Sequence, residues 1–364
     1  QGQIATLIMG ADAAWGESQG PVAPNALPQR SKITSDVIDA IASKIEAGGK
    51  VALLLEHHGV SPEALANASK ISAKTGCRLF TGTFPARVDG GPGNPEVERL
   101  PYFPEQVLQT LTGLDHLVLV GGEPPASFFA YRGIPGQLVP EGCTVSRLTQ
   151  NEEDAVDALS RLADRLGAAA ETVKTFERRA TPRPTGPLDT KSIIQAVAAT
   201  MPAGLIVATD SGGGNAAHAY CQNAESNSWL SLTGGAIGQG GPVATGAALA
   251  CPDRPVLAML GDGGAAYTNQ SFWTQARENL NVTTLIFANH SYNILNVEYA
   301  RLGVKEVGEI AASLFDIGNP ELDWVAMAKG FGVQGAHAKD AEDLCRLLEE
   351  SYKTPGPFVI QARA

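Results

Sequence analysis

The chain has 364 residues, 44% of them hydrophobic, and its 27 Lys and Arg against 38 Asp and Glu give a net charge of -11. A chain of this length can bury more than one core, since domains commonly hold about 100–200 residues. The negative charge argues against nucleic acid and anionic membranes as partners, because both attract basic surfaces. No apolar run approaches the ~20 residues of a membrane-spanning helix and no secretory leader opens the chain, so we expect a cytoplasmic protein.

The cysteines indicate neither a disulfide framework nor a zinc site. Their number is odd, they are scattered along the chain, and none has CxxC spacing. We expect reduced residues of the core. They are Cys77, Cys143, Cys221, Cys251 and Cys345.

The first residues predict a strand without a partner nearby in the sequence. Residues 3–9 are apolar enough for a buried strand, and the Pro-rich stretch 21–28 is typical of a linker between domains. A lone strand cannot bury itself. We therefore expect residues 1–15 to complete a sheet whose other strands lie outside this sequence.

Two series of alternating helices and strands follow, and a Pro-rich stretch at 181–187 that predicts a stiff linker separates them. Such alternation predicts two doubly wound α/β domains with parallel sheets, at residues 31–180 and 188–364. In the first domain we expect helices over 35–45, 62–75 and 152–179, and strands over 51–55, 78–80 and 117–120. In the second we expect helices over 190–200, 242–250, 269–279 and 292–302, and strands over 205–209, 256–260, 283–288 and 358–362.

The strongest chemical signal lies where two of these strands end. The strand 256–260 leads into Gly261-Asp262-Gly263-Gly264, and the next strand along the chain ends at Asn289. A right-handed crossover places both polar residues at the same edge of neighbouring strands. A carboxylate, an amide oxygen and a loop carbonyl are hard ligands suited to Mg²⁺. The bare glycines allow close approach of backbone amides to phosphate oxygens.

This strand–GDG–helix–strand–Asn arrangement resembles the diphosphate-binding motif of thiamine diphosphate-dependent enzymes. The resemblance implies that Asp262, Asn289 and the main-chain carbonyl of Ser291 bind Mg²⁺, which holds the diphosphate of the cofactor. The family often has two Asn in a row. Here Ala288 takes the first place, and the position of the ligand is kept.

A second segment resembles the part of the family motif that carries a bulky apolar residue between glycines. Ile237 occupies that place, and the resemblance implies that it wedges between the two rings of the cofactor and keeps it bent. The carbonyl of Gly235 would contact the exocyclic amine.

A third and more general match is the glycine-rich segment after the strand 205–209. It reads Asp210-Ser211-Gly212-Gly213-Gly214 and resembles a loop that closes over the diphosphate, with Ser211, Gly212 and Gly213 as the expected cofactor contacts. Tyr292, Asn293 and Ile294 are expected near the diphosphate or the substrate, at the mouth of the site.

The resemblance extends over nearly the whole chain and is closest to acetolactate synthase and benzoylformate decarboxylase. It implies a central domain at 31–180, a diphosphate-binding domain at 188–364, and the end of a pyrimidine-binding domain and a linker at 1–30. Most of the pyrimidine-binding domain is then missing, and with it the glutamate that activates the cofactor, so no residue here is assigned as catalytic. The family also implies a homodimer or homotetramer, because the cofactor lies between two subunits.

Several functions stay open on the sequence alone. The first is decarboxylation or carboligation of 2-keto acids, and the second is a non-catalytic member of the family that only binds thiamine diphosphate. A nucleotide-binding oxidoreductase is the third, although residues 235–240 have the order G-x-x-G-x-G rather than G-x-G-x-x-G. The keto acid and any FAD in the central domain are undetermined.

Some polar residues have an ordinary structural interpretation. His57 and His58 follow a strand and are expected to be structural or surface groups, and His290 is expected to be a loop residue. The loop 128–132 lies where benzoylformate decarboxylase carries an active-site histidine, and it contains none, which argues against an aryl keto acid. Asp262 could also simply shape a tight turn.

Overall fold

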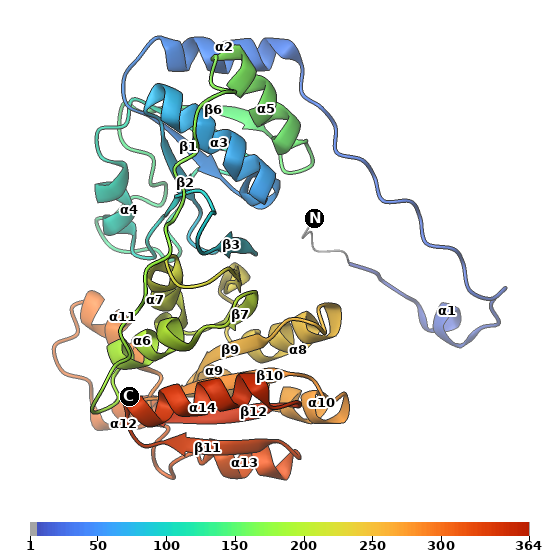
Figure 1. Ribbon diagram of the computed structural model, residues 1–364, viewed down its shortest axis with the longest axis vertical. Coiled ribbons are helices and arrows are strands. Elements are labelled where there is room, and N and C mark those ends of the chain that lie inside the picture. The colour runs from blue at the N-terminus through green and yellow to red at the C-terminus, as the bar shows by residue number, and fades with distance from the viewer. Residues whose placement is uncertain (1–5, 364) are drawn as a thin grey trace.

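Two sheets form the frame of the computed structural model, which describes residues 6–363 (Figure 1), and their central strands are buried on both faces. In Figure 1 the first sheet and its helices form the upper unit, and the second sheet and its helices form the lower one. Both sheets carry helices on two faces. The predicted doubly wound α/β fold is confirmed.

The upper unit is built on a five-stranded parallel sheet in the order β4-β2-β1-β5-β6. Its strands are β1 (Val51–Leu55), β2 (Arg78–Thr81), β4 (Glu98–Arg99), β5 (His116–Val120) and β6 (Thr144–Thr149). Apolar residues of three helices share one core with a face of this sheet, and a fourth helix covers the other face. These helices are α2 (Ser35–Glu46), α3 (Pro62–Thr75) and α5 (Ala155–Arg165), and on the second face α4 (Pro104–Leu111).

The lower unit has a seven-stranded sheet in the order β11-β12-β10-β9-β7-β8-β3. Its parallel strands are β7 (Leu205–Thr209), β8 (Asn227–Leu230), β9 (Val256–Gly261), β10 (Val282–Ala288), β11 (Gln334–Ala338) and β12 (Phe358–Arg363). One face packs on α6 (Thr190–Thr200), α7 (Gly212–Cys221) and α14 (Ala341–Lys353), and the other on α8 (Gly240–Ala250), α10 (Ser271–Arg277) and α13 (Trp324–Gly330). The shorter helices α9 (Asp262–Ala265), α11 (Asn293–Arg301) and α12 (Glu309–Phe315) follow β9 and β10 along the chain.

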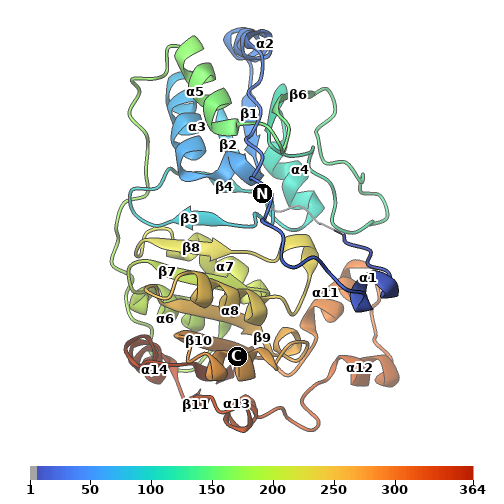
Figure 2. The ribbon, with the colours of Figure 1, turned by 90° about the vertical axis from the view of Figure 1, so that its right-hand side faces the viewer.

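One strand connects the two units. The short strand β3 (Val88–Gly90) comes from the sequence of the upper unit, yet it pairs antiparallel with β8 of the lower sheet, and Figure 2 shows it between the two units. Ser228 of β8 also donates a 2.6 Å hydrogen bond to the carboxylate of Asp89. Hydrogen bonding therefore assigns residues 88–90 to the lower sheet, while the domain limits given by the sequence stay a prediction.

The strand expected at the start of the chain is not present in the described residues. Residues 6–10 form no strand, and the side chains of Leu7, Ile8 and Met9 are exposed. A five-residue helix, α1 (Ala11–Trp15), follows, and the segment stands away from both units in Figure 1. Residues 6–9 are unpaired within this chain, and because the partner strands were expected outside this sequence, the strand stays a prediction; residues 3–5 lie outside the described part.

The helix expected over 152–179 is also too long. Helix α5 ends at Arg165, and Gly167 follows with a positive φ of 65°, a conformation that ends helices. Residues 174–176 instead exchange backbone hydrogen bonds with residues 93–96, for example from the N–H of Phe176 to the carbonyl of Asn94 at 2.9 Å. These hydrogen bonds to residues 93–96 thus determine the conformation of residues 174–176.

Two smaller expectations can be compared with the structure. Within residues 6–363 no helix has both the length and the apolar character needed to span a bilayer. The five cysteines are free thiols; Cys77, Cys221 and Cys345 are buried, whereas Cys143 and Cys251 are only partly buried.

Candidate functional site

The carboxyl ends of β9 and β10 bring Asp262 and Asn289 together. The two strands are parallel neighbours, and Phe287 is paired with Gly261, so both polar residues lie just beyond the last pairs of the sheet. Oδ1 of Asp262 accepts the N–H of Gly263 at 2.9 Å, and Oδ2 accepts the N–H of His290 at 2.6 Å. The loop after β10 is therefore attached to this carboxylate.

The carboxylate of Asp262 is buried and has no cationic side chain paired with it among residues 6–363. Asp262 is 2% exposed, and burial raises the pKa of its carboxyl group above the usual value. Within residues 6–363 no Lys or Arg forms an ion pair with it. A buried charge without a partner is costly. A divalent cation would supply the missing charge, so the residues present fit Mg²⁺.

Asn289 and Ser291 flank His290, whose N–H is bound to Asp262. Asn289 is exposed, and its Oδ1 accepts the N–H of Ser291 at 3.1 Å, which closes a tight turn directly after β10. An amide oxygen has two lone pairs, so this turn leaves acceptor capacity for a metal. In the part of the chain that the structure describes, no group of three or more His, Cys, Asp and Glu could hold a metal. A cation here would depend on amide and carbonyl oxygens beside the single carboxylate.

The glycines of the turn let neighbouring groups approach the backbone closely. A Cβ at Gly263 would lie 2.6 Å from a carbon of the Tyr292 ring, and one at Gly264 would lie 3.0 Å from Oδ1 of Asp210. Gly261 is the last residue of β9. Any side chain at Gly263 or Gly264 would therefore displace a residue of the site.

Ser211, Gly212 and Gly213 form the start of a helix rather than the loop that the sequence suggests. Ser211 caps α7: its Oγ accepts the N–H of Gly214 at 2.9 Å and donates to the carbonyl of Met259 at 3.3 Å. The first amides of a helix lack partners within it and favour anions. The segment therefore points unpaired N–H groups beyond the end of β7, next to β9.

Gly235 and Ile237 lie in the connection between β8 and α8. Gly235 has a φ of 66°, and its carbonyl accepts the N–H of Ile237 at 2.9 Å. The ring of Phe128 from the upper unit packs on Gly235, where a Cβ would lie 2.3 Å from a ring carbon. The side chain of Ile237 is 47% exposed. The side chain of Ile237 is thus free to contact a ligand. The contact of Phe128 with Gly235 is one that the sequence did not reveal.

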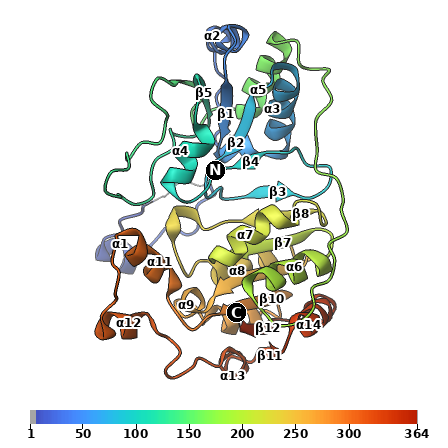
Figure 3. The same ribbon diagram turned by 90° about the vertical axis from the view of Figure 1, so that its left-hand side faces the viewer.

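Tyr292, Asn293 and Ile294 begin α11, and Ile294 is 41% exposed. This helix is fastened to the upper unit by Arg301, which forms an ion pair with Glu105 at 2.7 Å. Figure 3 shows α11 below α4, the helix that carries Glu105.

The same guanidinium lies over two aromatic rings, at 4.3 Å from the centre of Phe103 and 4.4 Å from that of Tyr131. The hydroxyl of Tyr131 donates to Glu298 at 3.1 Å. The loop 128–132, which the resemblance places where a relative has its histidine, therefore contacts α11 through a tyrosine.

The histidines His58 and His290 contact other groups of the protein. His57 and His58 begin a short 3-10 helix after β1 (His57–Val60), and Nδ1 of His58 accepts the N–H of Ala155 at 3.3 Å. The ring of His290 lies 3.4 Å from the carboxylate of Glu321.

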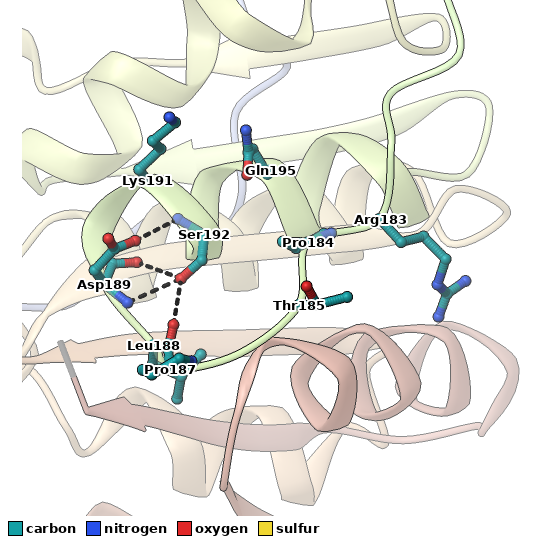
Figure 4. Close-up of a pocket in the computed structure, with 9 residues that line it drawn as sticks. All are labelled: Arg183, Pro184, Thr185, Pro187, Leu188, Asp189, Lys191, Ser192 and Gln195. Atoms are coloured by element: carbon teal, nitrogen blue, oxygen red, sulfur yellow. Dashed lines mark hydrogen bonds between the residues drawn. The ribbon is translucent and has the colours of Figure 1, made fainter.

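The structure also has two surface cavities, and Phe128 lines the first of them. One, of about 300 Å³, opens beside Glu56, Phe84 and Tyr102 of the upper unit. The other, of about 530 Å³, lies between the linker and α6 (Figure 4). There Asp189 and Ser192 already bond one another as the cap of α6. Neither cavity is lined by a predicted site residue, and we assign the second no function.

One carboxylate of the site was part of the glycine-rich match in the sequence but was given no role of its own. Asp210 follows β7 as Asp262 follows β9, is 7% exposed, and accepts two backbone N–H groups. The signal that could have identified it is the same in both places: an acidic residue between a buried strand and a glycine turn.

Comparisons with known proteins agree with this geometry. Residues 210–362 match the family described as "Thiamine pyrophosphate enzyme, C-terminal TPP binding domain"; thiamine pyrophosphate is another name for thiamine diphosphate. Over 361 residues the chain is 40% identical to a Mycobacterium tuberculosis protein named "Putative acetolactate synthase large subunit IlvX". Over 313 residues it is 30% identical to benzoylformate decarboxylase of Pseudomonas aeruginosa. These alignments cover 98% and 81% of this chain, but only 69% and 54% of the two relatives.

Solved structures show the same fold. A thiamine diphosphate-dependent 4-hydroxybenzoylformate decarboxylase from Rhodococcus jostii superposes with a TM-score of 0.74 at 23% identity, over 93% of this chain and 66% of that one. A thiamin diphosphate-dependent enzyme from Mycobacterium smegmatis, itself titled as putative, gives a TM-score of 0.70 at 22% identity, over 95% and 67% of the two chains.

Proposed function

Since this chain belongs to the thiamine pyrophosphate enzyme family, which includes acetolactate synthase and benzoylformate decarboxylase, we propose that it forms the Mg²⁺- and diphosphate-binding part of an enzyme acting on 2-keto acids. The reaction is decarboxylation, or transfer of the decarboxylated unit to a carbonyl acceptor. The observation that carries the proposal is the buried carboxylate of Asp262, attached to the loop after β10 and lacking a cationic partner within residues 6–363.

Three oxygens would hold the metal in this proposal. They are a carboxylate oxygen of Asp262, the amide oxygen of Asn289 and the main-chain carbonyl of Ser291, and Mg²⁺ would complete its shell with water and diphosphate oxygens. The N–H groups at the start of α7, after Ser211, would bind further diphosphate oxygens. Gly261, Gly263 and Gly264 keep side chains out of this space.

The ring half of the cofactor would lie against the 235–238 segment. There the half-exposed Ile237 would support the bent shape of the cofactor, and the carbonyl of Gly235 would accept a hydrogen bond from its amine. When bound, thiamine diphosphate supplies the nucleophilic carbon and the electron sink for loss of CO₂. Tyr292, Asn293 and Ile294 would border the entrance from α11.

Other parts of the active site would come from outside these 364 residues. The family uses a glutamate to activate the cofactor, and no residue of this chain matches it in sequence. We propose that this carboxylate belongs to a pyrimidine-binding domain and that the active assembly contains at least two subunits. A general acid–base group of this kind typically contributes about 10²–10⁴-fold to the rate.

A second candidate is a family member that binds thiamine diphosphate without turnover. It is favoured by the presence of the proposed metal ligands in a chain in which no residue matches the activating glutamate in sequence. Binding of the cofactor supports both candidates, so activity must separate them.

The test is CO₂ release from pyruvate and from benzoylformate, with thiamine diphosphate and Mg²⁺ present. The 364-residue chain would be compared with a protein extended N-terminally by about one further domain length. We expect turnover only in the extended protein, and analysis for acetolactate or aldehyde would identify the reaction. Turnover by the short chain would mean that the activating group lies within it, and cofactor binding without turnover in the extended protein would favour the second candidate.

A further inference from the structure

The carboxylate of Asp210 lies between two of the glycine segments assigned to the cofactor. Its Oδ2 accepts the N–H of Gly238 at 3.0 Å, in the connection that carries Ile237, and that of Gly240, the first residue of α8, at 3.2 Å. On its other side a Cβ at Gly264 would lie 3.0 Å from Oδ1. One side chain at the end of β7 therefore contacts the segment before α8 and the turn after β9.

The two oxygens of this carboxylate have different surroundings. Oδ2 has both hydrogen bonds, whereas Oδ1 is buried and has no partner within the described residues. No Lys or Arg of residues 6–363 forms an ion pair with Asp210 either. Burial raises the pKa of this carboxyl group above its usual value. Asp210 therefore contacts its neighbours through the two hydrogen bonds to Oδ2 and not through an ion pair.

The space around the carboxylate is also closely limited. A Cβ at Gly240 would lie 3.1 Å from Cγ of Asp210 and 2.4 Å from the side chain of Leu260. Glycine at this position lets the segment before α8 approach the end of β7. A longer acid in place of Asp210 would collide with one of the two glycine segments.

We propose that Asp210 is a positioning residue: it fixes the 235–240 segment, and with it Ile237, relative to the glycine turn at 261–264. This rests on the proposed function, because Ile237 supports the ring half of thiamine diphosphate and the glycine turn faces the diphosphate half. Asp210 determines how the two binding segments lie relative to each other.

Two variants separate hydrogen bonding from charge. Asp210→Ala removes both bonds to Gly238 and Gly240. Asp210→Asn keeps an oxygen for those bonds and places its NH₂ on the side of Oδ1, where no donor lies among the described residues. Asp189→Ala is the matched control: Asp189 accepts the N–H of Ser192 at 2.6 Å as the cap of α6, away from the predicted site.

Two measurements on the whole chain test the proposal. The first is hydrogen exchange of peptides covering residues 235–241 without cofactor. The second is calorimetric affinity for thiamine diphosphate and for inorganic pyrophosphate, each with saturating Mg²⁺. We expect faster exchange in Asp210→Ala and an affinity for thiamine diphosphate lowered by about tenfold, with less than about a twofold change for pyrophosphate. Asp210→Asn and Asp189→Ala should resemble the unaltered protein.

Three results would overturn the inference. They are unchanged exchange in Asp210→Ala, equal losses of affinity for both ligands, and the same losses in Asp189→Ala. If the unaltered protein binds neither ligand, the proposed function fails and the cofactor part of the inference fails with it. The exchange measurement then still decides whether Asp210 fixes the segment.

Discussion

The backbone N–H of His290 donates a 2.6 Å hydrogen bond to Oδ2 of Asp262, and this bond joins the ends of two neighbouring parallel strands. The predicted metal ligands Asn289 and Ser291 lie on either side of His290. A change in the position of the Asp262 side chain therefore changes the position of both other ligands. The three oxygens are best regarded as one coupled unit.

Replacement of Ile237 should affect catalysis more than affinity. In an active, N-terminally extended protein, Ile237→Ala should lower kcat by about 10- to 100-fold with a smaller change in the KM for thiamine diphosphate, because the side chain supports a reactive geometry. Steady-state kinetics checks this. Leu249→Ala is the control, since Leu249 is similarly exposed (55%) but lies at the end of α8. A loss confined to cofactor affinity would contradict the role.

Two adjacent glycines should respond differently to alanine. Gly234 and Gly235 both have positive φ values, 62° and 66°, so each substitution should cost about 1–2 kcal/mol of backbone strain. Only at Gly235 would the new Cβ also meet the Phe128 ring. Thermal unfolding should therefore show a larger loss of stability for Gly235→Ala than for Gly234→Ala. Equal losses would mean that Phe128 moves aside freely.

His218 of α7 should make stability depend on pH. Burial, and then the charge of Arg99, lower the pKa of its imidazole to about 3 from the usual 6.5. The unfolded chain then binds a proton before the folded one does, so the stability linked to this residue is present above about pH 6.5 and is lost progressively as the pH falls toward 3. Denaturant unfolding between pH 7 and 5 should show a steeper loss for the unaltered protein than for His218→Gln. His337→Gln, at an exposed histidine of β11, is the control, and identical slopes for His218→Gln and the unaltered protein would contradict the prediction.

The contact between α11 and the upper unit should be measurable as a coupling. Arg301 is largely buried while Glu105 is about half exposed, and the hydrogen bond from Arg301 lowers the pKa of the Glu105 carboxyl to about 2. A double-mutant cycle with Arg301→Gln and Glu105→Gln should give a coupling free energy of roughly 1 kcal/mol or less. Arg301→Lys should still destabilise the protein, because it loses the contact of the guanidinium with the rings of Phe103 and Tyr131. Full stability in Arg301→Lys would contradict the importance of that contact.

Local sequence predicts the parts of the fold that local patterns determine. Strands β9 and β10 are runs of apolar residues that are buried in the structure, and each is followed directly by a polar residue. Their existence and the closeness of Asp262 and Asn289 therefore follow from pattern and handedness. Helix α3 is similar, with Ser61 as its cap and Gly76 at its end. These features need no knowledge of distant residues.

Long-range pairing accounts for what the sequence analysis missed. Strand β3 has three residues and forms only by pairing with β8, far along the chain, and β11 is a half-exposed strand at the sheet edge without an apolar pattern. The hydrogen bonds of Asp210 to Gly238 and Gly240 are likewise tertiary.

The most direct test of the central claim is the calorimetric affinity for thiamine diphosphate with Mg²⁺ and with EDTA in its place, in the unaltered protein and in Asp262→Ala. Asp262 supplies the only charged ligand in the proposed metal site, so the account predicts binding that requires Mg²⁺ in the unaltered protein and is lost in Asp262→Ala. Equal affinity in the two proteins, or binding that EDTA leaves unchanged, would contradict it.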